Sequence, residues 1–550
     1  MTDRQRKTRD LLIILLAAFF FLGIALGSRD LWNPNEPTYG RVVVEMLESG
    51  NWLIPQLNGE PFAEKPILYY WLAAGVSKVL VTVSPVSLRA PVLLAGVLSV
   101  LLVYLLIEAY DGRRRALIGC ALFATLYGVW FTARNAQMDS FVLLCTLSVI
   151  VALTRRLDHE LSGTKAWLLA GVAAGLGFVA KGPVTTLVPG MVLFAYIVLG
   201  RRPWRRLLSG LPVGILTFLV FASPWYLALF FSGQTDALHE TLVRQNFSRF
   251  VSAWDHQQPW WYYLKYFWIT FAPWSWFVPI VAVSTVSRRK EEARPAQLLA
   301  WIWLLAPLVF FSLSQSKREP YLLPAAPAVA WLVAWLFDRL LEGGLRRWQV
   351  RASVGVSVAI GIVFLLGGIA LLWPGMVEVP GFETKLGIIA GVLLTAGLAA
   401  LGTIAWRRTR PYAPAGVWVS FVLFYLFIAM FAHRMANPLK SHQPIAQALE
   451  RQLPEGSRLY SFFGRFRTVR GGYPYYLGRA VPDLADEVTL RRTWDGESRP
   501  CLIYEEAQYR ELVEGLADAR VIFEGRVGSK TVRLVCADRG VSDTLLEAEV

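Results

Sequence analysis

Repeated long apolar runs constrain the fold of this chain more than any other feature. Runs of about 18–22 mostly apolar residues recur along its 550 residues, and each is long enough to cross a bilayer as a helix. The chain is 55% hydrophobic and 17% charged, so it is more hydrophobic and less charged than an ordinary soluble protein. The first run, "LLIILLAAFFFLGIALG", lacks a small-residue cleavage site, so we expect a retained helix. The sequence therefore predicts an all-α polytopic membrane protein.

Apolar length and flanking residues predict about thirteen membrane helices. We expect them at roughly 11–27, 86–108, 115–132, 139–155, 166–180, 183–199, 208–231, 262–284, 296–313, 321–340, 352–373, 385–406 and 414–431.

Basic clusters between the runs predict the orientation. They lie at 113–115, 155–156, 201–206, 288–290, 346–347 and 407–410. With the N-terminus in the cytoplasm, all of them fall on the cytoplasmic side, and an odd number of helices places the C-terminal tail outside. These clusters account for most of the net charge of +15, so we expect membrane lipids as partners and no nucleic acid.

The outer segments include a long first loop, 28–85, and the tail. The loop contains "TYGRVVVEMLES" and "KPILYYWLAAGVSKVL", which we expect to form helices at the membrane surface, although the second could be a further span. In the tail, strand-like runs ("SRLYSFF", "PCLIYEE", "ARVIFEG", "TVRLVCA") alternate with helical ones ("QPIAQALERQL", "EAQYRELVEGL"). The sequence predicts a membrane domain over 1–431 and a small α/β domain over 432–550. Cys501 and Cys536 either form a disulfide there or stay as buried free thiols.

Charged and histidine side chains gather at the outer ends of the apolar runs. They include Glu36, Glu64, Lys65, Arg134, Asp139, Lys181, Arg244, Arg249, His256, Lys317, Arg318, Lys440 and His442. Cations such as Lys65, Lys317 and Arg318 suit a lipid phosphate, and a carboxylate assists glycosyl transfer. The alternative is that the cations extend to the interface and the acids pair with them.

Several segments resemble, in order, those of membrane glycosyltransferases of the GT-C fold. They are "LWNPNEPTYGRVVVEMLESGNWLIPQLNGEPFAEKPILYYW", "ARNAQMDSF", "AKGPV", "SRFVSAWDHQQPWWYYLKYF", "SQSKREPYLLPAAPAVAWL" and "SHQPIAQAL". The chain is most similar to the lipid A aminoarabinose transferases, relatives of the protein O-mannosyltransferases. This resemblance implies thirteen helices, a periplasmic C-terminal domain and a location in the bacterial inner membrane. It also implies an undecaprenyl-phosphate-sugar donor and a lipid A or glycan acceptor.

The resemblance assigns the catalytic positions unevenly. The family's first loop usually reads Asp-Glu, followed two residues later by Arg-Tyr. Here these positions hold Asn35, Glu36, Thr38 and Tyr39. Asn35 cannot act as a base, although its amide can bond an acceptor or a sugar. Glu36 is the carboxylate that remains, and Asp139 matches the family's second aspartate, so we expect these three residues at the reaction centre.

The resemblance also implies binding sites for a phosphate and a metal. Lys65, Lys317, Arg318 and Tyr321 match phosphate-facing positions, and we expect Tyr39 and Arg249 to take part. The zinc-binding positions of the aminoarabinose transferases are Glu64, His256 and His442 here, which are acceptable ligands without a ligand-spacing motif. His256 could instead be an interfacial polar residue. We expect no nucleotide cofactor and a monomer.

Two other functions stay open at this point. A flippase or transporter of lipid-linked sugars would need polar groups at the bilayer midplane, and the predicted helices carry almost none there. A catalytically impaired homologue that only binds polyprenyl phosphate is suggested by Asn35 and Thr38.

Overall fold

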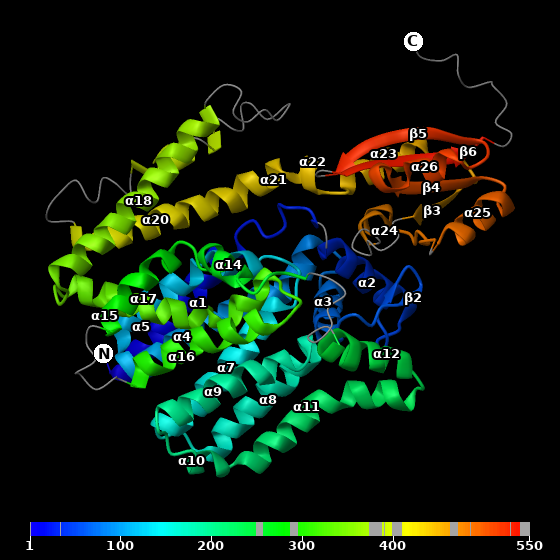
Figure 1. Cartoon of the computed structure of the whole chain (residues 1–550). Coiled ribbons are helices and arrows are strands. Elements are labelled where there is room, and N and C mark those ends of the chain that lie inside the picture. The colour runs from blue at the N-terminus through cyan, green and yellow to red at the C-terminus, as the bar shows by residue number, and fades with distance from the viewer. Residues whose placement is uncertain are drawn as a thin grey trace. The chain divides into compact units, whose positions relative to one another are not determined.

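The computed structural model describes most of the chain (Figure 1). The described residues are 2–32, 35–248, 257–286, 295–372, 388–389, 391–395, 397–398, 410–462, 471–484, 486–527 and 530–538. Arg249, His256 and most of the expected helix 385–406 lie outside them.

The chain divides into two compact units by its internal contacts. The first unit comprises Met1–Leu26, Ala63–Tyr69 and Arg89–Ala432. The second comprises Gly27–Phe62, Tyr70–Leu88 and His433–Val550. Most of the long first loop therefore packs with the tail, and the domain boundary at 431 stays a prediction.

The first unit is helical. Its elements are α1 (Asp3–Gly23), α4 (Pro85–Asp111, which begins in the second unit), α5 (Arg113–Ala124), α6 (Tyr127–Thr132), α7 (Asp139–Asp158), α8 (Gly163–Lys181), α9 (Val184–Leu199), α10 (Arg205–Leu208), α11 (Leu211–Phe231), α12 (Thr235–His239), η1 (Glu240–Ser248), α14 (Tyr262–Thr270), η2 (Trp274–Phe277), α15 (Val278–Val286), α16 (Pro295–Leu313), η3 (Glu319–Ala325), α17 (Ala326–Leu341), α18 (Arg347–Leu372), η4 (Arg410–Tyr412), α20 (Ala413–Phe427) and η5 (Ile428–Ala432).

Eight helices within the described residues are long and apolar enough to cross a membrane, or up to nine with one bent pair. They are α4, α7, α8, α11, α16, Glu319–Leu341, α18 and Ala413–Met435. The chain is thus mostly helical with many candidate spans, as expected. The number thirteen stays a prediction.

Two expected helices are broken in the structure, and the two breaks face each other. The expected helix 115–132 divides into α5 and α6, and 262–284 bends by 108° between α14 and the helix Trp274–Val286. The Tyr127 N–H donates to the Ala272 carbonyl at 2.9 Å, and the Trp274 indole N–H donates to the Thr125 hydroxyl at 3.0 Å. The polar groups at one break therefore form hydrogen bonds with polar groups at the other break.

Helix α8 lies between α7 and α11 (Figure 1). A Cβ added at Gly171 would lie 2.0 Å from the Thr217 hydroxyl oxygen and 2.5 Å from the Gly214 carbonyl oxygen. Glycine is required there because the two backbones approach closely, as in small-residue contacts of membrane helices.

Ion pairs tie α4, α5 and α17 together. Arg115 donates to Asp338 at 2.8 Å and also pairs with Asp111, while Arg114 donates to Asp338 at 2.5 Å. The Trp331 indole N–H donates to Asp111 at 2.7 Å. Part of the basic cluster at 113–115 therefore has a structural role as well as marking topology.

The second unit contains a four-stranded sheet in the order β3-β4-β6-β5 (Figure 1). Strands β3 (Arg458–Phe462) and β4 (Pro500–Glu505) are parallel, whereas β6 (Lys530–Ala537) is antiparallel to β4 and to β5 (Ala519–Val527). The helices of the tail are α21 (His433–Met435), α22 (Asn437–Lys440), α23 (Gln443–Gln452), α24 (Gly472–Leu477), α25 (Glu487–Gly496) and α26 (Glu506–Glu514). The four expected strands and two expected helices of the tail are all confirmed.

Both faces of this sheet are covered. Cys501 and Ile503 of β4 belong to an apolar cluster with Leu449 of α23. Leu502, between them in the strand, belongs to another cluster with Trp494 of α25. Alternate strand residues point to opposite faces, so the tail is built as helices packed on a mixed sheet.

The first-loop segments of the second unit form α2 (Glu36–Ser49), the short hairpin β1 (Gln56–Leu57) and β2 (Glu60–Pro61), and α3 (Leu68–Val79, which begins in the first unit). The Glu45 carboxylate accepts the N–H groups of Asn58 at 2.7 Å and Gly59 at 3.0 Å. These two hydrogen bonds hold the hairpin turn against α2. Both expected loop helices are present, and their place at the membrane surface stays a prediction.

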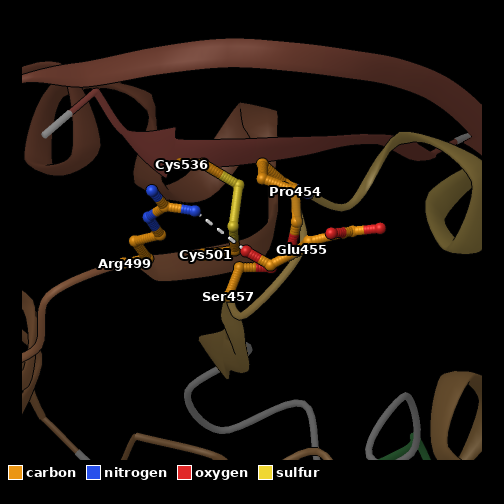
Figure 2. Close-up of a disulfide and its surroundings, with 6 residues drawn as sticks. All are labelled: Pro454, Glu455, Ser457, Arg499, Cys501 and Cys536. Carbon is orange, nitrogen blue, oxygen red and sulfur yellow. Dashed lines mark hydrogen bonds between the residues drawn. A yellow bond between two sulfur atoms is a disulfide. The ribbon is translucent and has the colours of Figure 1, made fainter. Parts of the chain in front are cut away.

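Cys501 and Cys536 form a disulfide across directly opposed positions of β4 and β6 (Figure 2). Their Cα atoms are 4.1 Å apart. Beside it, Arg499 donates to the Glu455 carbonyl oxygen at 3.0 Å. Of the two alternatives that the sequence left open, the structure has the disulfide.

Candidate functional site

A cavity of about 540 Å³ lies in the first unit. Most of its wall is apolar, from residues such as Val142, Leu187 and Phe310. Its polar residues include Glu64, Lys65, Asp139, Lys181 and Tyr321. The structure therefore brings together four residues that the sequence selected for three different roles, and adds Lys181.

Asp139 and Lys181 form the central polar contact of this cavity. Asp139 is the first residue of α7, where the helix N-terminus favours a negative charge, and Lys181 is the last residue of α8. The Lys181 ammonium donates to the Asp139 carboxylate and lies 5.6 Å from the centre of the Tyr321 ring. Lys181 was among the outer charges in the sequence, but we did not select it. Its position in "AKGPV", one of the family-like segments, was the available signal.

Glu64 and Lys65 reach the cavity from the segment before α3. The Lys65 ammonium donates to the Glu64 carbonyl oxygen at 3.1 Å. The Thr241 hydroxyl, from the π-helical element η1, donates to the Ala63 carbonyl oxygen at 2.8 Å. Two segments distant in sequence are thus joined at the wall of the cavity, and π-helical turns are frequent at functional sites.

Lys317 and Arg318 line a different cavity, of about 320 Å³, together with Tyr262, Lys265 and Glu319. The Lys317 ammonium donates to the carbonyl oxygens of Gln258, at 3.0 Å, and Ser314. Burial lowers the pKa of Lys317. Four of the expected phosphate-binding residues are therefore divided between two cavities, with Lys65 and Tyr321 in the larger one.

Glu36 lies in the second unit and is 1% exposed. Its carboxylate accepts from the Arg29 guanidinium at 2.9 Å and from the Trp32 N–H at 3.2 Å. Arg29, which no sequence motif singles out, thereby ties the start of the loop to the first turn of α2. This contact gives Glu36 a structural role, and its catalytic role stays a prediction.

Asn35 and Tyr39 flank that first turn. Asn35 precedes α2 as its N-cap residue, and its side chain makes no capping hydrogen bond. Tyr39 is buried in α2, with its ring 5.8 Å from that of Tyr70 in an edge-to-face contact. Both lie in the second unit, so the structure does not relate them to the cavity of the first.

Of the three predicted zinc ligands, the structure describes Glu64 and His442. Within the part of the chain that the structure describes, no three His, Cys, Asp or Glu side chains gather at a possible metal site. Glu64 is in the first unit, His442 is in the second, and His256 lies outside the described residues. His442 is 1% exposed, its ring lies 4.7 Å from that of Tyr473, and burial lowers its pKa to about 4. We therefore derive no catalytic step through a metal.

Comparisons with known proteins agree on one family. Residues 64–227 match the family model of dolichyl-phosphate-mannose-protein mannosyltransferases. The chain is 31% identical over 440 residues to the undecaprenyl phosphate-alpha-4-amino-4-deoxy-L-arabinose arabinosyl transferase of Pseudomonas aeruginosa (strain LESB58), covering 79% of this chain and 77% of the relative. It is 28% identical over 459 residues to the enzyme of the same name from Pectobacterium carotovorum subsp. carotovorum (strain PC1), covering 80% of each.

A solved structure shows the same fold. The crystal structure of ArnT from Cupriavidus metallidurans bound to undecaprenyl phosphate superposes with a TM-score of 0.75 at 22% identity. The match covers 96% of this chain and 98% of that one. This is the GT-C fold that the sequence resemblance implied. Since the Pseudomonas relative also exceeds 30% identity over most of both chains, the protein belongs to the family of GT-C membrane glycosyltransferases that includes the undecaprenyl phosphate-aminoarabinose arabinosyl transferases.

Proposed function

We propose that this protein transfers a sugar from an undecaprenyl-phosphate-linked donor to a lipid A-like lipid or a glycan on the periplasmic face of the inner membrane. The observation that carries this proposal is the 540 Å³ cavity. It combines apolar walls, which suit a polyprenyl chain, with two lysines and two carboxylates, which suit a phosphate and a sugar.

Lys65 and Lys181 have a defined task in this reaction. As the bond between the sugar C1 and the donor phosphate breaks, negative charge grows on the leaving phosphate. Fixed cations stabilise that growing charge more than they stabilise the bound donor, so they lower the barrier. Tyr321, whose ring lies beside Lys181, lines the same cavity.

Asp139 would orient the acceptor or take up its proton, in contact with Lys181. Glu36 is the other carboxylate that we propose for this reaction, and Asn35 would bond the acceptor or the sugar. The family resemblance implies inversion at C1.

The disulfide supports a periplasmic place for the second unit. Disulfides persist in oxidising compartments such as the bacterial periplasm. The Cys501–Cys536 pair therefore agrees with the orientation proposed from the basic clusters, in which the N-terminus is cytoplasmic.

An impaired homologue is the second candidate, and Asn35 favours it because the family has an aspartate there. The test uses purified protein, radiolabelled polyprenyl-phospho-sugars, and lipid A or glycan acceptors. We expect transfer by the wild type and at least a tenfold loss in Lys65→Gln. Polyprenyl-phosphate binding without transfer from any donor would replace our proposal with the impaired homologue.

Zinc binding by Glu64, His256 and His442 is a separate proposal. Metal analysis of the purified wild type and His256→Ala tests it. We expect less zinc in the variant, and equal zinc in both would remove His256 as a ligand.

A further inference from the structure

A third cavity, of about 470 Å³, lies in the first unit at the far end of helices that line the 540 Å³ cavity. Helix α7 begins at Asp139 in the 540 Å³ cavity and ends at Asp158 in this one. Helix α16 begins here with Pro295, and Phe310 near its last turn lines the 540 Å³ cavity. Since α7 has 20 residues, about 30 Å of helix separates the two cavities.

The two carboxylates in the wall of the 470 Å³ cavity already have partners. Asp158 accepts from the Tyr110 hydroxyl at 2.5 Å and from the Tyr196 hydroxyl at 2.6 Å. The Arg202 guanidinium lies 3.4 Å from its other carboxylate oxygen. Asp111, the second carboxylate, takes part in the ion pairs between α4 and α5. The negative charge of the wall is therefore compensated before any ligand enters.

Two arginines of the same wall are suited to an anion. Arg206 of α10 donates one N–H to the Leu157 carbonyl oxygen at 3.0 Å, and no carboxylate among the described residues pairs with it. A guanidinium has several N–H donors, so others remain for a ligand. Arg202 is held in place by Asp158 and by the Tyr196 ring, whose centre is 5.0 Å from the guanidinium carbon. Guanidinium groups held in this way bind phosphate oxygens through paired hydrogen bonds.

The surface beside these arginines is apolar and suits a lipid. The segment 200–208, "GRRPWRRLL", has four arginines and no acid. Trp204 and Leu208 are each 53% exposed, and Leu199 at the end of α9 is also exposed. Exposed tryptophan and leucine next to arginine are typical of a segment at the level of the lipid headgroups. A lipid phosphate could therefore reach the arginines while its acyl chains contact these apolar side chains.

We propose that the 470 Å³ cavity binds the phosphate of an anionic glycerophospholipid from the leaflet opposite to the proposed reaction. In the orientation expected from the basic clusters, that leaflet is the cytoplasmic one, and its anionic lipids are attracted to basic pockets between helices. The wall includes the ends of α4 and α7, the helix α10 and the start of α16. A bound lipid would hold these elements together and so stabilise two helices, α7 and α16, that also line the 540 Å³ cavity.

A lipid titration followed by Tm tests the inference. Delipidated full-length protein in a neutral detergent is titrated with short-chain phosphatidylglycerol, and phosphatidylcholine of the same chain length is the neutral control lipid. A ligand that binds only the folded protein raises Tm, so we expect phosphatidylglycerol to raise it and phosphatidylcholine to leave it unchanged. Each variant is compared with its own Tm in the absence of lipid, so that a change in basal stability does not affect the result.

Neighbouring arginines provide a matched pair of variants. We expect Arg206→Gln to raise the half-saturating concentration of phosphatidylglycerol roughly tenfold, through the loss of charge-assisted hydrogen bonds. Arg205→Gln removes the same charge from an exposed residue that does not line the cavity, and it should keep the wild-type value. An equal effect in both variants would indicate diffuse attraction to the basic segment, and a wild-type value in Arg206→Gln would exclude the cavity. Either result would overturn the inference.

Two further arms identify the ligand and the cavity. Inorganic phosphate at the same concentrations should give no shift, and an equal shift that Arg206→Gln weakens would assign the site to a soluble anion instead. Lys65→Gln should keep the shift with phosphatidylglycerol, because Lys65 lines the 540 Å³ cavity. Loss of the shift in Lys65→Gln but not in Arg206→Gln would place the lipid in that cavity. Sugar transfer is not measured, so the inference and the proposed function can fail independently.

Discussion

At the scale of single residues, the structure shows which cation each of the two predicted catalytic carboxylates contacts. Asp139 lies in the larger cavity and accepts a hydrogen bond from Lys181, a cation that we propose for the donor phosphate. Glu36 is held by Arg29 in the second unit. Both lie at the outer ends of apolar runs, and the family resemblance assigned them to the reaction centre. It did not indicate their partners, because Lys181 and Arg29 are ordinary cations until the fold brings them into contact.

Asp139→Asn tests the first carboxylate. We expect kcat to fall on the order of 10²–10⁴-fold, since the amide can neither take a proton nor balance Lys181. Asp236→Asn, an exposed acid on α12 that lines neither cavity, is the matched control and should keep wild-type activity. A wild-type kcat in Asp139→Asn would remove Asp139 from the chemistry.

The variant Glu36→Gln tests the second predicted carboxylate. Removing one partner of a buried ion pair costs about 3–5 kcal/mol, so we expect a lower Tm. The double variant Arg29→Met/Glu36→Met removes both charges and should regain most of that stability. The sugar-transfer rate of this double variant then decides the catalytic role, because a wild-type rate would show that Glu36 takes no part in the reaction.

At the scale of elements, the local sequence predicted most helices and strands, and contacts between distant segments lie where two of the predicted helices are broken. All four strands of the tail were predicted because short apolar runs between turn residues have few alternatives. The break between α5 and α6 was missed because "LYGVWF" continues an apolar run. At that break the Tyr127 N–H bonds to Ala272 and the Trp274 indole N–H bonds to Thr125, and these partners are about 145 residues apart in sequence.

The contact between α8 and α11 gives a prediction with a built-in control. In an open helix, Gly→Ala is stabilising by roughly 1 kcal/mol. Gly190→Ala on α9, where nothing lies within 4 Å of the new Cβ, should therefore keep or raise the Tm. Gly171→Ala should lower the Tm, by about 1–3 kcal/mol in unfolding free energy, because its Cβ meets Thr217 and the backbone of Gly214. Equal Tm values for the two variants would contradict the close contact.

At the scale of the whole molecule, helix content and family are established, and the orientation in the membrane is open to a direct test. The native cysteines do not interfere with labelling, since Cys120 and Cys145 are buried and Cys501 is paired with Cys536. Lys165 near the start of α8 and Ser232 after the end of α11 are exposed residues at opposite ends of packed helices.

An impermeant maleimide applied to intact spheroplasts should label Ser232→Cys and leave Lys165→Cys unlabelled until the membrane is permeabilised. This result follows from placing the basic clusters in the cytoplasm. The reverse pattern would place the 540 Å³ cavity on the cytoplasmic side and exclude a periplasmic reaction.

The sequence by itself determined the class of protein, most of the helices, the strands of the tail and the family, because these depend on apolar length, local periodicity and ordered motifs. Only the tertiary structure decided which charged residues share a cavity. Lys65 and Tyr321 line one cavity and Lys317 and Arg318 another, although all four had the same expected role. Side chains one residue apart can face opposite sides of an irregular segment, and the direction of each is set by packing against helices far away in the chain.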